Sequence, residues 1–386
     1  MLGGHFSRAR EADPGRLHFA AHSHHPWPDA TEAAHAAYWS DAAALLDRKW
    51  ERVLGEVLPR AQGHVGRLLA LSDARQVAFA PNTHEFVVRL YSCLDDRRPA
   101  RVLTSAHEFH SFRRQARRLA EDGRIALREV PAAPFDSFVE RFVAAEASEP
   151  WDLVFLSHVH FDTAFVVNGL EAICAAAPAH ALVAIDGYHA FCALPVDLAR
   201  VHRRAFYIAG GYKYAMSGEG ACFLAAPPEC DARPANTGWF AAFDSLSDAP
   251  TARVAYAGDA FRFWGSTFDA SGLYRFVAAM DWLAGTGSSI GQVHEHARSL
   301  QERFLAGLDA IGSPRLGRRH LALPAGTPRG NFLAFDVDDG AALEARIAEA
   351  GVAIDRRERR LRFGFGVYHE AADVDRLVEA LRPVLR

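Results

Sequence analysis

The sequence predicts an α/β protein with a mostly parallel seven-stranded sheet, followed by a smaller α+β domain. Between residues 77 and 224, seven short apolar runs bounded by turn residues alternate with amphipathic stretches. This alternation is typical of a parallel sheet covered by helices on both faces, because parallel strands need long crossover connections. The predicted strands are residues 77–80, 101–105, 126–130, 153–157, 182–186, 206–209 and 221–224.

The segments on either side of this region have helical periodicity. Residues 30–71 are predicted to be helical, since aromatic and aliphatic positions recur there at the spacing of one helix face. The C-terminal part has a different pattern, with helices expected at 273–283, 290–308, 341–350 and 371–385 and strands at 331–337 and 361–363. We therefore expect an N-terminal arm at 1–40, a large domain at 41–270 and a small domain at 271–386.

Composition narrows the class of protein. Half of the 386 residues are hydrophobic and the formal net charge is -4, so the chain can bury a large core and has no broad basic field for nucleic acid. It has no apolar run of about 18 residues that could span a membrane and no apolar N-terminal stretch of the kind a secretion signal needs. The five cysteines form no Cys-x-x-Cys pair, which favours free thiols. A cytoplasmic protein is expected.

Polar residues follow three of the predicted strands. Asp186 ends one strand, Lys213 lies in a Gly- and Tyr-rich turn after the next, and Thr83 follows the first strand at the start of a helix. Ligands of open α/β sheets bind beyond the carboxyl ends of the strands. Taken singly, Lys213 could be a surface charge, and Asp186 and Thr83 could be helix caps.

Together these residues match the needs of a cofactor that is an aldehyde, a pyridine and a phosphate. Lys213 supplies an amine for a Schiff base, Asp186 a carboxylate for a protonated ring nitrogen, and the helix start at Thr83 free N–H groups for a phosphate. The order and spacing of the three favour pyridoxal 5'-phosphate (PLP) over the separate structural explanations.

The segment from Asp186 to Leu198, followed by Tyr212-Lys213-Tyr214 and Gly218-Glu-Gly220, resembles the kynureninase version of the class V aminotransferase motif. The resemblance runs from about Phe19 to Leu385 and implies a fold type I PLP enzyme. Further matching segments are His158 to Thr163, Gly238-Trp239-Phe240, Gly351 to Asp355, Leu361-Arg362-Phe363 and Tyr368.

The resemblance also implies roles around the cofactor. Lys213 would carry the cofactor and move the Cα proton, Asp186 would pair with the ring nitrogen, and His189 would lie beside the ring. Phe109 would stack on the ring face. Tyr212 would donate its hydroxyl to the phosphate and would be a second catalytic residue.

The remaining implied roles concern the phosphate, the substrate and a second subunit. Asn82 and Thr83 would bind the phosphate, and Arg362 would bind the substrate α-carboxylate as a bidentate fork. Ser23 and His24 would lie at the mouth of the site. Trp239, Ser266 and Thr267 would reach the cofactor of the other subunit in a homodimer. Phe109 and Trp239 could instead be core aromatics.

Departures from the family pattern concern the substrate pocket. The chain has His22-Ser-His-His25 where the family has Asn-Ser-Leu-Gly, Asp162 where it has Arg or Tyr, and Phe112 where it has Asp. Only Asp269 is a loose match for the family's asparagine near the substrate ring. The four-residue His cluster suggests a metal site, but no carboxylate or cysteine lies at ligand spacing, so none is expected.

Three functional hypotheses follow. The first is a kynureninase-like hydrolase that cleaves L-kynurenine or a related β-acyl alanine to alanine and an aryl acid. The second is a class V aminotransferase or lyase acting on another amino acid. A cysteine desulfurase is disfavoured because Cys222 and Cys230 follow the lysine turn too closely. The third is a non-catalytic protein that keeps the fold, against which the joint presence of Lys213, Asp186 and Arg362 argues.

Overall fold

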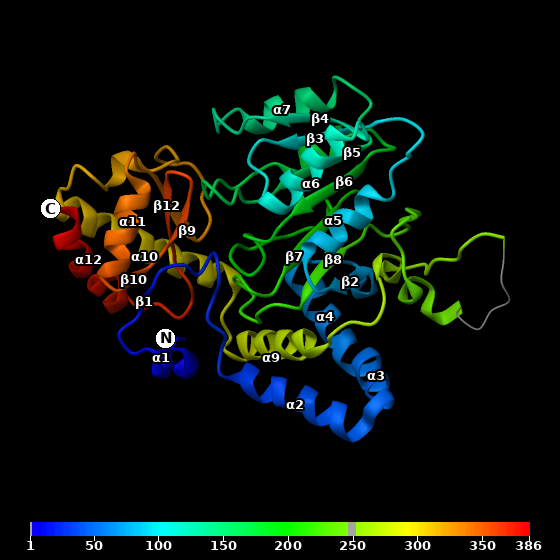
Figure 1. The fold of residues 1–386 in the computed structure, drawn as a ribbon, viewed down its shortest axis with the longest axis horizontal. Helices are drawn as coiled ribbons and strands as arrows, with labels where there is room; N and C mark the ends of the chain where they lie inside the picture. The colour runs from blue at the N-terminus through cyan, green and yellow to red at the C-terminus, as the bar shows by residue number, and fades with distance from the viewer. Residues whose placement is uncertain (1, 246–251) are drawn as a thin grey trace.

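The computed structural model describes residues 2–245 and 252–386, and its centre is a seven-stranded sheet (Figure 1). The strand order is β2-β8-β7-β6-β5-β3-β4. All neighbouring pairs are parallel except those of β8, which runs antiparallel to both β2 and β7. The prediction of a mostly parallel seven-stranded sheet is confirmed. The strands are β2 (Val77–Ala80), β3 (Ala100–Ser105), β4 (Ile125–Val130), β5 (Leu153–Ser157), β6 (Leu182–Asp186), β7 (Phe206–Gly210) and β8 (Cys222–Ala225).

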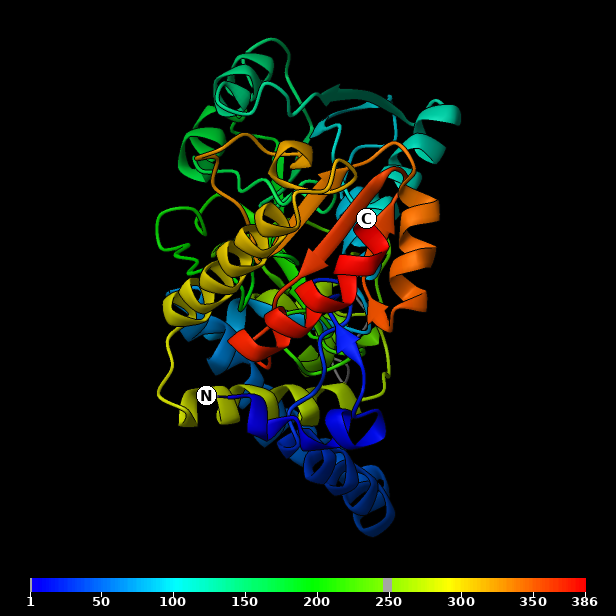
Figure 2. The same cartoon turned by 90° about the vertical axis from the view of Figure 1, so that its left-hand side faces the viewer.

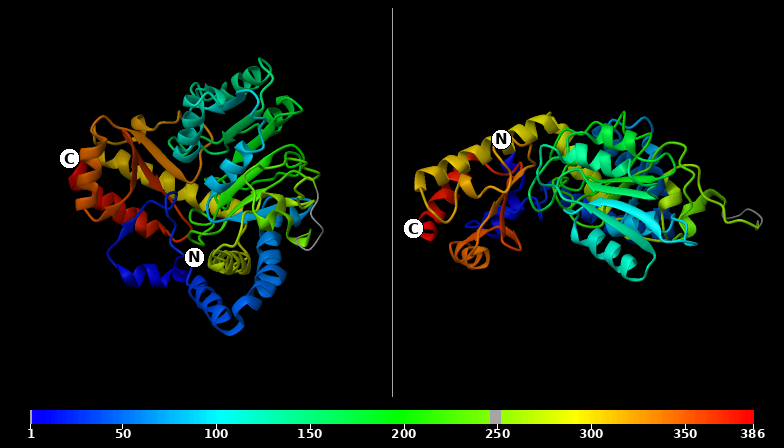
Figure 3. Two further views of the ribbon diagram at one scale, coloured as in Figure 1. Left: turned by 45° about the vertical axis from the view of Figure 1, so that its right-hand side comes forward. Right: turned by 90° about the horizontal axis from the view of Figure 1, so that it is seen from above.

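Helices cover both faces of this sheet (Figure 3). The inner strands are buried along nearly their whole length, which is why they are recognisable as short apolar runs in the sequence. The helices of the chain are α1 (Ser7–Ala12), α2 (Ala30–Leu45), α3 (Lys49–Arg52), α4 (Leu58–Leu68), α5 (Thr83–Tyr91), α6 (His110–Glu121), α7 (Phe138–Glu146), α8 (Leu170–Ala176), α9 (Ser271–Gly285), α10 (Ile290–Ile311), α11 (Gly340–Glu349) and α12 (Ala371–Leu385).

A second, smaller sheet lies in the C-terminal part (Figure 2). It consists of β11 (Asp355–Arg357), β12 (Arg360–Gly364) and β9 (Phe332–Asp336), all antiparallel. This sheet has a core of its own, in which Phe304 of α10 packs against Phe335 and Phe363.

The N-terminal segment joins this smaller unit. The two-residue strand β1 (Leu17–His18) pairs in parallel with β10 (Val352–Ala353), and Ala20 forms a bridge with Gly364. Further along, α2 packs on α9, whose buried side chains belong to the core of the large sheet. The division of the chain at residues 40 and 270 remains a proposal.

The helix predicted over residues 30–71 is wrong as a single element. α2 ends at Leu45 because Leu46 adopts a left-handed backbone with φ of 53°, and the chain reverses there (Figure 1). It then continues through α3, a π-helical turn (Val53–Val57) and α4. The helical periodicity is the same before and after the reversal, so the pattern alone does not mark it. Among the described residues, no helix is long and apolar enough to cross a membrane.

Candidate active site

The carboxyl ends of β2, β3, β5, β6 and β7 meet at one edge of the large sheet, because these strands point the same way. A cavity lies at this edge, and several of the sequence-predicted site residues surround it. Its lining consists of Thr83, Phe109, Ser157, Val159, Phe161, Asp186, Tyr188, His189, Tyr212 and Lys213. Asn82, which precedes Thr83 in the sequence, is exposed and is not part of this lining. Its side-chain oxygen caps α5 by accepting a hydrogen bond from the Glu85 N–H at 3.1 Å.

Lys213 is buried at the centre of this cavity. Its Nζ lies 2.8 Å from His189 Nε2, and no carboxylate of the described residues lies within salt-bridge distance of it. Burial lowers the pKa of Lys213 to about 7, and the positive charge of Arg362 acts in the same direction against the charge of Asp186. A large fraction of the amine is therefore unprotonated near neutral pH and can act as a nucleophile or a base.

Two aromatic rings enclose the lysine amine. Its Nζ lies 5.2 Å from the ring centre of Phe109 and 4.5 Å from that of Tyr188. Phe109 was predicted to be here, whereas Tyr188 was missed although it follows Asp186 by two residues. Gly210 makes room for it, since a Cβ at that position would collide with the Tyr188 hydroxyl and with Cys222. The lysine amine therefore lies close to two flat apolar ring surfaces.

Two buried acids, Asp186 and Glu108, lie close enough to each other to interact electrostatically. Asp186 accepts a hydrogen bond from the Tyr188 N–H at 2.9 Å, and burial raises its pKa while the charge of Lys213 lowers it. Glu108 is fully buried and contacts the hydroxyls of Ser105 at 2.5 Å and Ser157 at 2.6 Å. Burial raises the pKa of Glu108 to about 8, so this carboxyl is mostly protonated at neutral pH. No role for Glu108 was predicted from the sequence.

Arg362 lies on β12, in the small sheet, and is 2% exposed. One terminal nitrogen binds the carboxylate of Asp355, directly opposite on β11, and the other donates to the Phe161 carbonyl. Its Nε has no hydrogen-bond partner among the described residues. Burial lowers the pKa of Arg362 to about 10. A substrate carboxylate at this fork would therefore share it with Asp355.

The loop from His22 to His25 lies beside Tyr212. His24 is exposed and stacks on the Tyr212 ring at 5.1 Å, and Ser23 lies 3.4 Å from His24 Nδ1. His22 is fully buried, stacks on Phe332 at 4.6 Å, and neither of its ring nitrogens has a partner in the described part of the chain. Within residues 2–245 and 252–386, no group of three or more metal-ligating side chains is close enough to hold an ion.

A model of the family described as "Aminotransferase class-V" matches residues 54–377, which is most of the chain. The chain belongs to the class V aminotransferase family. Its fold is that of the fold type I PLP enzymes, and PLP is its cofactor. No curated protein matches the sequence.

Solved structures with the same fold have low sequence identity to this class V enzyme. A C-DES mutant with glycine covalently linked to the PLP cofactor has a TM-score of 0.81 and 17% identity, with 97% of this chain and 98% of that chain covered. Apo cysteine desulfurase from Thermococcus onnurineus NA1 has a TM-score of 0.79 and 15% identity, with 98% of each chain covered. A cysteine desulfurase from Escherichia coli has a TM-score of 0.76 and 18% identity, again over 98% of each chain.

These comparisons support the family and the cofactor but give no support to the kynureninase-specific part of the resemblance. The three proteins are desulfurases or, for C-DES, a cystine C-S lyase by the description of a second structure.

The residues at the strand edge fit PLP. The amine of Lys213 is buried without a counter-ion, which suits covalent attachment to an aldehyde, and Asp186 is the acid available to a ring nitrogen. Phe109 and Tyr188 line the cavity beside the amine, and aromatic rings there suit contact with a flat ring. Thr83, the first residue of α5, also lines the cavity, and a helix N-terminus favours a phosphate.

Three residues expected at the cofactor lie elsewhere in the class V chain. Ser266 and Thr267 are exposed and line a separate pocket together with Arg89, Asn236 and Gly238. Trp239 is 44% exposed, so the alternative that it is a core aromatic is wrong. Their predicted action on the site of a second subunit remains a proposal.

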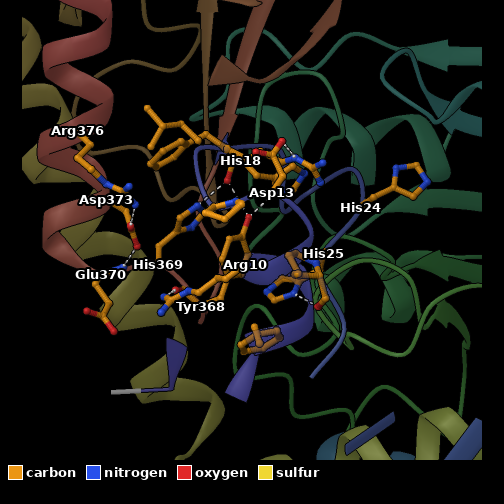
Figure 4. Close-up of a pocket in the computed structure, with 17 residues that line it drawn as sticks. Arg10, Asp13, His18, His24, His25, Tyr368, His369, Glu370, Asp373 and Arg376 are labelled. Atoms are coloured by element: carbon orange, nitrogen blue, oxygen red, sulfur yellow. Dashed lines mark hydrogen bonds and ion pairs between the residues drawn. The ribbon is translucent and has the colours of Figure 1, made fainter. Parts of the chain in front are cut away.

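A further cavity, of about 490 Å³, is lined by His24 and His25 together with residues of the N-terminal segment and of α12 (Figure 4). It separates the N-terminal segment from α12, and its wall includes His18, which contacts the Tyr368 hydroxyl at 2.6 Å. The His24-His25 loop links it to the active site, since the His25 N–H donates to the Tyr212 carbonyl at 3.0 Å.

Proposed function

We propose that this class V enzyme is a PLP-dependent lyase that eliminates a leaving group from Cβ of an amino acid. The observation that carries the proposal is the buried amine of Lys213, with a pKa of about 7 and no carboxylate to hold its proton. A base with a pKa near the working pH is best suited to remove the Cα proton and return it. Loss of that proton and of the Cβ substituent gives an enamine, which water converts to pyruvate and ammonium.

Bound PLP supplies the aldehyde and the electron-accepting ring. Around it, Asp186 would hold the ring nitrogen in its protonated form, and Phe109 and Tyr188 would fix the plane of the ring. Arg362 would bind the substrate carboxylate, with Asp355 setting the direction of its guanidinium. The protonated Glu108 would leave Asp186 as the one charged acid at the ring, because two adjacent buried carboxylates resist joint ionisation.

The cysteines favour elimination over sulfur transfer to a protein thiol. Cys222 is the cysteine nearest to Lys213 and is 1% exposed in β8, where its thiol lies 3.3 Å from the Tyr188 hydroxyl. Burial raises the pKa of Cys222 to about 11, so it is not a thiolate at neutral pH. Cys174 and Cys192 are buried in the core, and Cys93 and Cys230 are half-buried outside the cavity lining.

Hydrolysis of a β-acyl alanine such as L-kynurenine is the second candidate. It is favoured by the resemblance of the segment from Asp186 to Leu198 and of Gly238-Trp239-Phe240 to kynureninase. Against it stand Phe112, which is buried against Phe155 with 3.7 Å between the ring centres, and the exposed His24 at the mouth. Phe112 stands where the family has Asp and cannot supply that polar contact, whereas His24 places a polar ring where the family has Leu.

The test uses the purified holoenzyme with three reactions in parallel. β-Chloro-L-alanine and L-cystine are expected to yield pyruvate and ammonium, and Lys213→Ala is expected to yield neither. Anthranilate and alanine from L-kynurenine would instead establish the hydrolase. Amination of an added 2-oxo acid, with no pyruvate from either lyase substrate, would contradict both candidates and establish an aminotransferase.

We further propose a cytoplasmic homodimer with shared sites. Ser266, Thr267 and Trp239 are exposed and lie outside the cavity of their own chain. In a symmetric dimer, residues placed in this way can complete the site of the other subunit.

A further inference from the structure

A second pocket, of about 320 Å³, lies beside the active site between α6 and the β11–β12 hairpin. We call it the arginine pocket; five arginines and three carboxylates line it, together with two histidines. Phe161 lines both this pocket and the cofactor cavity, and its carbonyl receives the bond from Arg362. The arginines are Arg113, Arg356, Arg357, Arg359 and Arg360.

The hairpin holds like charges together at a cost in stability. Arg357 and Arg360 are directly opposite each other on β11 and β12, where two cations repel. Between them, Glu358 takes a left-handed backbone with φ of 52°, which is unfavourable for a residue with a side chain. The end of the hairpin thus brings positive charge to the wall of the pocket.

The carboxylates of the pocket are mostly committed to one arginine. Arg360 contacts Asp162 at 2.5 Å and Asp336 at 2.8 Å, and Asp162 also contacts His107 at 2.8 Å. Arg359 shares Asp336 at 3.4 Å, and Arg356 pairs with Glu344 outside the lining at 2.6 Å. The remaining carboxylate of the lining, Glu358, is exposed.

Two arginines keep unused donors. Arg113 has no carboxylate within salt-bridge distance among the described residues, and its contact is with the imidazole nitrogen Nδ1 of His110 at 3.1 Å. Arg357 pairs with Asp355 at 2.9 Å, but its Nε is shielded from solvent and has no hydrogen-bond partner in the described part of the chain. Buried donors are normally satisfied, so the unpartnered Nε of Arg357 indicates a missing acceptor. Arg113 is partly exposed and adds donors that no carboxylate of the described residues occupies.

The start of α6 adds to the positive field. This twelve-residue helix begins at His110, has no acidic residue in its first turn, and receives no capping bond from the Phe109 side chain. Its free N–H groups and its dipole favour a negative charge at the same place as the Arg113 and Arg357 donors.

We propose that the arginine pocket binds an oxyanion (a carboxylate, phosphate or sulfonate group) and that this anion is the distal acidic group of the amino acid substrate. Asp355 connects the pocket to the α-carboxylate site, since it pairs with both Arg357 and Arg362. A substrate with acids at both ends would contact both arginines. The second half of the proposal rests on the proposed function, whereas the first does not.

The first experiment measures anion binding by the holoenzyme without any amino acid. Inorganic phosphate is titrated calorimetrically into the wild type, Arg113→Met and Arg117→Met at constant ionic strength. Arg117 is the matched control, because it is on the same helix but 59% exposed and outside the pocket. Arg113→Met is expected to weaken phosphate binding about tenfold or more, the effect of losing a charge-assisted hydrogen bond, and Arg117→Met to leave it unchanged.

The second experiment compares substrates that differ in the distal acid. The kcat/KM of S-sulfo-L-cysteine is expected to exceed that of β-chloro-L-alanine, and Arg113→Met is expected to lower the first value about tenfold and leave the second within a factor of two. Arg357→Gln provides a second variant, should Arg113→Met not fold.

The outcomes separate the two parts of the proposal. Phosphate binding that depends on Arg113, without any preference for acidic substrates, would assign the pocket to a free anion. The same binding in an enzyme inactive towards every amino acid would retain the pocket and refute the proposed function. Phosphate binding that is absent, or equal in Arg113→Met and the wild type, would overturn the proposal.

Discussion

The cofactor cavity and the arginine pocket share Phe161 but treat charge in opposite ways. In the cavity, Lys213 and Glu108 are buried without an opposite charge in salt-bridge contact, so burial moves both pKa values towards neutral pH. In the pocket, Asp162 is half-buried, and burial would raise its pKa, but His107 and Arg360 outweigh that effect and hold the pKa below the ordinary range. The cofactor cavity thus has groups that can exchange protons near neutral pH, whereas the arginine pocket has groups that stay charged there.

This contrast predicts a division of labour between chemistry and recognition. Substitutions in the cavity should change the rate of the chemical step and its pH dependence. Substitutions of the arginines should change binding, with smaller effects on turnover.

The largest effect is expected from Lys213→Ala. Loss of the amine should abolish the covalent attachment of PLP and lower kcat by about a thousandfold or more. Borohydride treatment followed by mass spectrometry of the intact protein measures the attachment. A reducible adduct on the variant would mean that another lysine carries the cofactor, and the cavity around Lys213 would not be the site of the chemistry.

A smaller effect is expected from Arg362→Lys, which keeps the charge but loses the fork. We expect kcat/KM to fall about 10- to 100-fold, mainly through a higher KM, because a bidentate contact becomes a single one. Arg382→Lys, at an exposed pair with Glu379 on α12, is the control. An effect confined to kcat would mean that Arg362 acts in the chemical step and not in substrate binding.

The proposed dimer predicts that two inactive variants regain activity when their subunits form mixed dimers. Lys213→Ala and Thr267→Ala chains, each inactive, should regain about a quarter of wild-type activity when unfolded and refolded together, since half of the dimers would be mixed and each would have one intact site. Light scattering gives the accompanying mass. An active monomer would contradict the hypothesis that a second subunit contributes residues to the site.

The smallest effect is expected from Glu108→Gln, and it appears in stability. The pKa of Glu108 is raised from about 4.5 to about 8 on folding, so the folded state binds more protons in this window and the wild type loses stability as the pH rises through it. Glutamine imitates the protonated acid and lacks this loss. The difference in Tm between Glu108→Gln and the wild type should therefore grow in favour of the variant from pH 5 to pH 8 and then level off. Parallel curves would show that Glu108 does not titrate there.

The sequence predicted the large sheet well because its strands are buried on both faces. Runs such as residues 77–80 and 153–157 are apolar throughout or nearly so, and polar residues end them or follow them within two positions. The direction of β8 was not predictable, since a four-residue apolar run is the same in either direction. The reversal at Leu46 and the two-residue strands β1 and β10 depend on tertiary contacts that leave no periodic signal.

Around the site, residues directly after strands were easier to identify than those that support them. Lys213 and Asp186 combine a rare residue type with a strand end. Tyr188 and Glu108 were not predicted. Tyr188 lies two residues after Asp186 and Glu108 one residue before Phe109, and a neighbour of a motif residue usually has no role of its own. A glycine at 210 was the available signal for Tyr188, since that position has no room for a side chain.

The pairing of β1 with β10 joins residues 17–18 to residues 352–353, more than 300 positions apart. During synthesis the chain emerges from the ribosome N-terminus first, so β1 cannot pair until β10 has been made. The strands of the large sheet are complete before that and can already pair. Closing so long a loop is entropically costly and slow. The mouth residues His22 to His24 follow β1 directly and bridge to Gly364 through Ala20. We therefore expect the entrance to assemble after the strand ends around Lys213, so that a newly made chain has its lysine in place before its entrance is complete.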